Sequence, residues 1–239
     1  MIDLSSYERV ALQFSGGKDS LACLYLLKPQ LDQLTVYWCD TGDSYPETRS
    51  IIDAVRSFIP KFVVIRSDVK GWRLENGLPS DLVPARSHFI GVAYGMSQTK
   101  ISNRFDCCAS NIMLPMHSRM IEDGVDLVIR GTKRSDTGKL PADGKTPFYD
   151  ILLPIRDWTN QQVFDYLEKV GAPKNPLYEY FTGMSAPECL GCTAWWDDGK
   201  SACLKAFHQP EYAVYRKNLE KISAAVQQSV VELRAELAV

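Results

Sequence analysis

Short apolar runs of strand length alternate with helix-length segments through most of the chain. The runs are rich in β-branched and aromatic residues, as buried strands are. The helix-length segments carry apolar residues three or four positions apart, as in residues 47–58, which predicts amphipathic helices. Because this alternation is typical of a parallel sheet with helices on both faces, we expect a doubly wound, mostly parallel α/β fold of about five strands. The predicted strands are residues 10–14, 34–39, 62–65, 126–130 and 151–155.

Residues 67–106 break this rhythm, because glycines and prolines interrupt a stretch that also carries aromatic and basic side chains. Long irregular insertions in compact domains are usually functional or disordered. The aromatic residues argue against disorder, so we interpret the segment as a lid or loop that faces the substrate. A solvated surface excursion is the alternative.

The end of the chain has a different pattern. From Pro210 onward, apolar residues recur every three or four positions as far as Leu237, which predicts a long amphipathic helix. We therefore expect a nucleotide-binding and cluster domain at residues 1–193 and a C-terminal helical extension at residues 194–239. This helix is predicted to pack on the domain, and its length would also permit a homodimer contact.

Net charge, apolar runs and cysteine content limit the classes of function that this chain can have. The net charge is −2, so contact with nucleic acid would have to depend on a local patch rather than on a global field. No apolar run approaches the roughly 20 residues of a membrane-spanning helix, and the first residues do not resemble a signal peptide. We expect a cytoplasmic protein without membrane contact, whose seven cysteines are reduced or bound to metal.

A glycine turn joins the first predicted strand to a helix that ends before Pro29. Strand, glycine turn and helix together present backbone N–H groups and the positive helix end to an anion. The spacing differs from the Walker pattern, and an ordinary glycine-rich turn is the alternative. The predicted phosphate-binding residues are Ser15, Gly16, Gly17, Lys18, Asp19 and Ser20.

Two further loops follow predicted strands at the same edge of the sheet, where doubly wound folds bind ligands. The first contains Asp40, Thr41 and Gly42, which helix capping by the following Pro46 and Glu47 does not explain. In the second, basic side chains would contact sulfate or phosphate, with a solvated turn as the alternative. The residues of this second loop are Arg130, Gly131, Lys133 and Arg134.

Four cysteines form two pairs, Cys107-Cys108 and Cys189-x-x-Cys192. Adjacent cysteines rarely share one tetrahedral zinc, whereas a cubane iron–sulfur cluster distributes its thiolates over separate irons. A zinc site or a redox disulfide between the second pair remains an alternative. Cys23 and Cys39 fall within predicted elements and are interpreted as core residues.

The loop Ser15–Ser20 resembles the signature of the PP-loop, or ATP pyrophosphatase, superfamily, which binds adenine nucleotides by their phosphates. Residues 40–48, residues 175–178 and the four cysteines resemble the sulfonucleotide reductases, which act on phosphoadenylyl sulfate or adenylyl sulfate. The resemblance covers residues 9–193 and implies a [4Fe-4S] cluster on the four cysteines, a catalytic Lys18, and a thioredoxin- or glutaredoxin-like reductant. The family usually has Gly-x-Arg where this chain has Lys133, which leaves Arg134 to take that role.

The resemblance ends after the second cysteine pair, because the family's Glu-Cys-Gly-Leu-His segment with its nucleophilic cysteine is absent. Cys203 is the candidate replacement, since Lys200, Lys205 and His208 would lower its pKa. A buried structural cysteine is the alternative.

Three functions fit these features. The first is a reductase that releases sulfite and AMP, or its 3′-phosphate, from an adenylylated sulfate beside the cluster. The second is an ATP-dependent sulfur transferase that releases pyrophosphate and acts on tRNA or DNA. The third is a protein that binds adenylate without catalysis. We favour the first.

Overall fold

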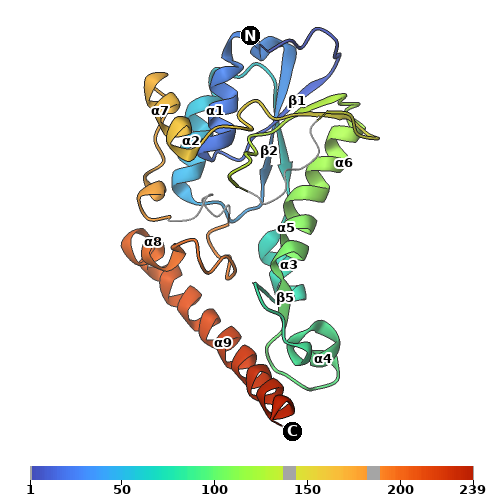
Figure 1. The fold of residues 1–239 in the computed structure, drawn as a ribbon, viewed down its shortest axis with the longest axis vertical. Helices are drawn as coiled ribbons and strands as arrows, with labels where there is room; N and C mark the ends of the chain where they lie inside the picture. Colours follow the sequence, from blue (N-terminus) through green and yellow to red (C-terminus); the bar gives the residue numbers. More distant parts are fainter. Residues whose placement is uncertain (1, 137–143, 182–188, 239) are drawn as a thin grey trace.

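The computed structural model describes residues 2–136, 144–181 and 189–238. A sheet of five parallel strands forms its centre (Figure 1), which confirms the predicted fold class. The strands are, in their order across the sheet, β3 (Phe62–Arg66), β2 (Leu34–Asp40), β1 (Val10–Gln13), β6 (Leu127–Ile129) and β7 (Asp150–Leu152).

Side-chain alternation along the strands separates two hydrophobic cores. In β1, Val10 and Leu12 belong to one core, whereas Ala11 belongs to the other. The first core also contains residues of α1 (Lys18–Leu26), α2 (Pro46–Arg56) and α7 (Asn160–Lys169), and the second contains residues of α6 (Leu114–Glu122). Helices therefore cover both faces of the sheet, as Figure 1 shows.

The path of the chain through the sheet determines where loops meet. From β1 the chain adds β2 and β3 on one side, and then returns to place β6 and β7 on the other side of β1. The direction of winding thus reverses between β1 and β6, and ligands of doubly wound folds bind at the carboxyl ends of the strands at such a reversal. The loops that follow β1, β2 and β6 lie at this edge.

The segment 67–106 has more regular structure than the sequence predicted. It contains β4 (Leu78–Ser80) and β5 (Ile101–Asn103), which pair in parallel as a separate small sheet. It also contains the short 3₁₀ helix η2 (Ala85–Ser87). Its helices are α3 (Val69–Asn76) and α4 (Phe89–Ala93). Strands of three residues are too short to give a recognisable alternation, and they form here through tertiary pairing. The role of this segment as a lid stays a prediction.

Helical structure around the first cysteine pair begins earlier than predicted. Asn103 caps α5 (Arg104–Cys108) by accepting a 2.8 Å hydrogen bond from the Phe105 N–H. A π-helical turn (Ala109–Met113) then continues α5 into α6. Cys107 and Cys108 consequently lie on a helix rather than in a loop.

The chain ends in α8 (Lys200–Phe207) and the long α9 (Gln209–Leu237), which runs away from the sheet in Figure 1. Only Tyr215 and Ile222 of α9 are fully buried, while apolar residues near its end are exposed. The predicted helix is confirmed, and a dimer contact through it stays a prediction.

Among the described residues, no helix combines the length and apolar character needed to cross a bilayer. The remaining elements are two short 3₁₀ helices, η1 (Lys28–Gln33) and η4 (Pro176–Glu179).

Candidate functional site

The loop Ser15–Ser20 connects β1 to α1 and has the predicted strand–turn–helix form. Gly16 adopts a positive φ of 79°, and a Cβ there would lie 2.9 Å from the Thr48 side chain. Gly17 is the N-cap residue of α1, and it has no side chain that could form a capping hydrogen bond. Ser20 closes the turn, because its hydroxyl accepts from the Ser15 N–H and donates to the Gly17 carbonyl. Backbone N–H groups are thereby presented at the start of α1.

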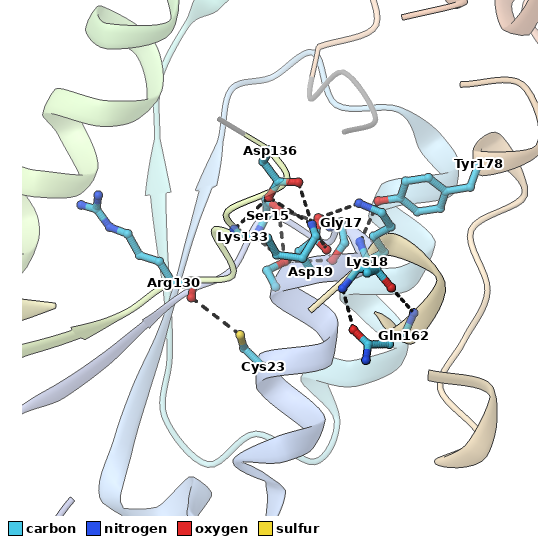
Figure 2. A network of polar contacts seen from close by, with 12 residues as sticks. Ser15, Gly17, Lys18, Asp19, Cys23, Arg130, Lys133, Asp136, Gln162 and Tyr178 are labelled. Carbon is cyan, nitrogen blue, oxygen red and sulfur yellow. Dashed lines mark hydrogen bonds and ion pairs between the residues drawn. The ribbon is translucent and has the colours of Figure 1, made fainter. Parts of the chain in front are cut away.

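Two of these N–H groups already have partners in the structure, and the Gly17 N–H donates to the Ser15 hydroxyl at 3.3 Å. The Tyr178 hydroxyl lies 2.6 Å from the Lys18 backbone nitrogen and accepts its hydrogen bond (Figure 2). Tyr178 belongs to η4, which Asn175 caps by accepting from the Leu177 N–H. The hydroxyl oxygen occupies a position at which an anionic oxygen would bind. The sequence pointed to residues 175–178 only as a motif and did not reveal this contact.

A buried group of opposite charges lies beside the loop. The Lys18 ammonium pairs with Asp19 at 2.7 Å, and the Lys133 ammonium pairs with Asp19 at 2.6 Å and with Asp136 at 2.8 Å. Figure 2 shows the four side chains together. Burial lowers the pKa of Lys18, and the Asp19 carboxylate opposes that shift. The group joins the start of α1 to the loop that follows β6.

The position of Lys133 changes the prediction that it binds sulfate. Its side chain is 0% exposed and is already engaged by two carboxylates, so its ammonium is not presented to a ligand. Gly131 permits this arrangement, because a Cβ there would lie only 2.7 Å from the Asp19 carbonyl carbon. Lys133 is instead an internal link between two loops of the site.

The two predicted arginines of this loop have different surroundings. The Arg130 side chain extends away from the buried charges in Figure 2, and its carbonyl accepts a weak hydrogen bond from the Cys23 thiol. Arg134 is largely exposed and pairs with Asp157 at 3.2 Å. Arg134 is therefore the more accessible of the two arginines, whereas Arg130 is half-buried.

The loop after β2 is folded by its own side chains. Asp40 accepts from the Gly42 N–H and forms a two-bond pair with Arg49, at 2.7 and 2.8 Å. Thr41 is buried, and its hydroxyl lies 3.6 Å from the Cys189 sulfur. This loop thus connects the nucleotide rim with the second cysteine pair.

Three of the four predicted cluster cysteines come together in one buried apolar group, which we call the cysteine pocket. It consists of Cys107, Cys189 and Cys192 with Val69 and Ala194. Cys108, the next residue along α5, is half-buried.

The second cysteine pair is attached to the loop after β2. Ser44 and Cys189 form an antiparallel bridge, and Asp43 accepts hydrogen bonds from Leu190 and Gly191. The cysteine pocket therefore lies at the same edge of the sheet as the loop Ser15–Ser20.

Two buried cations border the cysteine pocket. Arg73 pairs with Asp43 at 2.5 Å and lowers the pKa of the nearby Cys107 thiol, while its Nε atom has no partner among the described residues. The Lys200 ammonium donates a 2.9 Å hydrogen bond to the Cys189 carbonyl. Burial raises the pKa of Cys107 and lowers that of Lys200 to about 8. The pocket is thus a low-dielectric site with positive charge beside thiols.

This environment suits an anionic inorganic group. Among the described residues, no three His, Cys, Asp or Glu side chains are arranged to hold a single metal ion. A cubane cluster does not require the thiols to converge on one point, and its thiolate-bound form is an anion. The unpartnered Arg73 Nε and the excess of buried cations fit such a group better than they fit neutral thiols.

The surroundings of Cys203 differ from those expected of a nucleophile. The side chain is fully buried in an apolar group with Tyr45, Leu177 and Leu204. Burial raises the pKa of the Cys203 thiol to about 11, Glu47 adds to the shift, and Lys200 opposes it. The predicted lowering of this pKa is wrong, because desolvation outweighs the neighbouring cation. A catalytic role for Cys203 is therefore not supported by its environment.

Two cavities of similar size flank the sheet. One of about 410 Å³ opens beside the loop Ser15–Ser20 and is lined by Gly16, Lys18, Phe164 and Tyr178, among others. The other, of about 430 Å³, lies near the amino-terminal ends of the strands and contains none of the predicted site residues. Chemistry rather than volume identifies the first cavity as part of the site.

Fold and site together define a doubly wound α/β protein with a glycine turn between strand and helix at the point where its winding reverses. The chain belongs to the phosphoadenosine phosphosulfate reductase domain family, whose model matches residues 9–194. The predicted family resemblance, over residues 9–193, is thereby confirmed.

Known relatives agree with this membership. The chain is 28% identical to a phosphoadenosine 5′-phosphosulfate reductase of Proteus mirabilis over 193 residues, which cover 80% of this chain and 73% of that protein. Its identity to the enzyme of the same name from Yersinia enterocolitica is 27%, over 80% of this chain and 72% of the relative. The phosphoadenylyl-sulfate reductase of Candida auris, solved as a phosphate complex, has the same fold, with a TM-score of 0.52 and 15% identity. That match covers 73% of this chain and 79% of the Candida auris chain.

Proposed function

We propose that this protein is a thiol-dependent sulfonucleotide reductase, which converts adenylyl sulfate or phosphoadenylyl sulfate to sulfite and AMP or adenosine 3′,5′-bisphosphate. Membership of the reductase domain family supports the reaction class. The observation that carries the proposal is the turn at Gly16 and Gly17, which leads from β1 into the start of α1 at the edge of the sheet where winding reverses.

Each part of the edge has a role in this proposal. The turn and the positive end of α1 hold the α-phosphate. Lys18 is buried and pairs with Asp19, but unlike Lys133 it lines the cavity beside the loop, so in this proposal its ammonium also contacts the phosphate. The loop Asp40–Gly42 forms the rim of the nucleotide site. Arg134 is the accessible cation for the sulfate group, because Lys133 is committed to the interior.

The reaction balances with an external dithiol. The bond between sulfur and the bridging oxygen breaks, the nucleotide leaves with that oxygen, and sulfur(VI) is reduced to sulfur(IV). Two thiols of a thioredoxin- or glutaredoxin-like protein supply the two electrons and become a disulfide. The buried Cys203 is not required in this scheme, and the reaction fits the reducing cytoplasm expected from the sequence.

Cys107, Cys108, Cys189 and Cys192 would hold a [4Fe-4S] cluster in this proposal. When bound, the cluster supplies an electrostatic partner for the substrate rather than electrons. The apolar cysteine pocket would keep water from Cys107, Cys189 and Cys192, and the bordering cations would balance the negative charge of the thiolates.

Sulfite release tests the proposal directly. Anaerobically purified protein should release sulfite from at least one of the two sulfonucleotides when thioredoxin and its reductase are supplied. Lys18→Met should lower this rate by about tenfold or more, because a charge-assisted contact to phosphate is worth roughly 1.5–3 kcal/mol. Lys217→Met, which changes an exposed lysine of α9, is the matched control. Pyrophosphate release from ATP without sulfite release from either sulfonucleotide would favour the sulfur transferase and refute the reductase.

A further inference from the structure

Among the described residues, the cysteine pocket is bordered by more buried positive than buried negative charge. Arg73 and Lys200 are cationic, whereas Asp43 is the carboxylate buried beside them. Lys70 also approaches Asp43, at 3.7 Å, but its side chain is mostly exposed. Isolated charges are costly in an apolar interior unless a counter-charge accompanies them. An anion bound in the pocket would balance the excess positive charge of these described residues.

Among the described residues, Lys200 has no acidic partner that would explain its burial. It is 1% exposed, it forms no ion pair with a carboxylate of the described residues, and its ammonium lies 5.7 and 5.5 Å from the rings of Tyr45 and Tyr215. Its hydrogen bond goes to the backbone carbonyl of Cys189. The side chain thus delivers a charge to the turn that carries the second cysteine pair.

Arg73 reaches the same turn from α3. One end of its guanidinium pairs with Asp43, which in turn accepts from the Gly191 N–H. The same side chain lies near enough to Cys107 to oppose the rise in the pKa of that thiol, and among the described residues its Nε is buried without a partner. Arg73 therefore contacts both halves of the cysteine set and has donor capacity left over.

We propose that Arg73 and Lys200 are positioning residues that compensate the negative charge of a thiolate-bound iron–sulfur cluster in the cysteine pocket and so set its retention and its reduction potential. Positive charge beside an anionic cluster favours the reduced state, which carries one more negative charge. The inference rests on the cluster of the proposed function and not on the reaction that the protein catalyses.

The test compares charge-removing variants of the cluster-loaded protein. Lys200→Met and Arg73→Met should each give a more negative midpoint potential for the cluster in an anaerobic spectroscopic titration. Each should also lose iron to a chelator about tenfold faster than the wild type, the lower end of the usual effect of groups around metal ligands. Lys205→Met is the control, because Lys205 is an exposed lysine of the same helix and should change neither quantity.

A charge-preserving variant separates electrostatics from packing. Arg73→Lys keeps the charge and loses the guanidinium fork, so it should retain a midpoint potential close to that of the wild type. If Lys200→Met fails to fold, the midpoint potentials of Arg73→Met and Arg73→Lys still test the inference. Potentials and iron loss equal to those of the Lys205→Met control, or a wild-type protein that binds no iron, would overturn the inference. Iron binding without sulfite release would refute the proposed reaction and leave this inference standing.

Discussion

Replacement of Lys133 by methionine is the sharpest test of how the site is constructed. The substitution keeps the length of the side chain and removes the ammonium that joins Asp19 to Asp136. Asp19 would retain Lys18, while Asp136 would retain only the hydrogen bond from the Lys133 backbone N–H. Two loops of the site would then lose their shared cation.

The magnitude follows from the burial of the three groups. Removal of one partner from a buried ion pair typically costs about 3–5 kcal/mol. Here the two carboxylates are 19% and 20% exposed, so water replaces part of the lost interaction, and we expect a loss of about 2–3 kcal/mol. For a protein of this size that corresponds to a fall in Tm of roughly 4–12 °C.

Thermal unfolding monitored by circular dichroism, without nucleotide, measures this effect. Lys174→Met is the matched control, because Lys174 pairs with Glu168 at 2.9 Å on the surface and its loss should cost less than about 1 kcal/mol. Calorimetric titration with AMP and with adenylyl sulfate should show weaker binding of both ligands to Lys133→Met. An unchanged Tm, combined with weaker binding of adenylyl sulfate alone, would show that Lys133 contacts sulfate and that our reasoning is wrong.

Two further substitutions examine the roles assigned from the structure. Cys203→Ala should lower the free energy of unfolding by about 1 kcal/mol and leave the rate of sulfite release per folded molecule intact; abolished release would restore Cys203 as the nucleophile. In the native protein the Cys203 thiol should also resist iodoacetamide at pH 8, because a pKa of about 11 leaves little thiolate there, and rapid alkylation followed by mass spectrometry would contradict this. Gly131→Ala should destabilise the protein by about 1–3 kcal/mol and weaken AMP binding, since the new Cβ would press on the backbone of Asp19 and Ser20; unchanged unfolding and affinity would show that the loop adapts freely.

Local sequence patterns were enough to predict the elements that rely on local chemistry. One such element is α7, which begins at a capping box of Thr159 and Gln162, and the structure contains both hydrogen bonds of that box. The glycine turn after β1 is likewise readable, because backbone conformation there depends on the residues themselves. The short strands β4 and β5 escaped prediction because three residues give no pattern and their pairing is a tertiary contact.

The chemistry of the site depends on neighbours that are distant in sequence. Lys133 reads as a surface cation of a loop, and only its contact with Asp19 of α1 shows that it is internal. The motif around Tyr178 was noted, but the approach of its hydroxyl to α1 depends on how the chain folds back. The cysteine spacing predicts that the two cysteine pairs form one site. The cations that border this site, Arg73 and Lys200, come from α3 and α8, and no sequence pattern around them indicates that they lie beside the cysteines.

Asp43 makes three separate parts of the chain interdependent. It pairs with Arg73 of α3, it accepts from the Gly191 N–H, and its own backbone carbonyl accepts from Leu190. A methyl group on Gly191 would lie 2.8 Å from the Arg73 guanidinium and 3.0 Å from the Asp43 carboxylate, so little space remains for substitution. During divergence, positions 43, 73 and 191 should consequently be kept or exchanged as a set, and a homologue that altered one of them alone would have to rebuild the turn that carries its thiols.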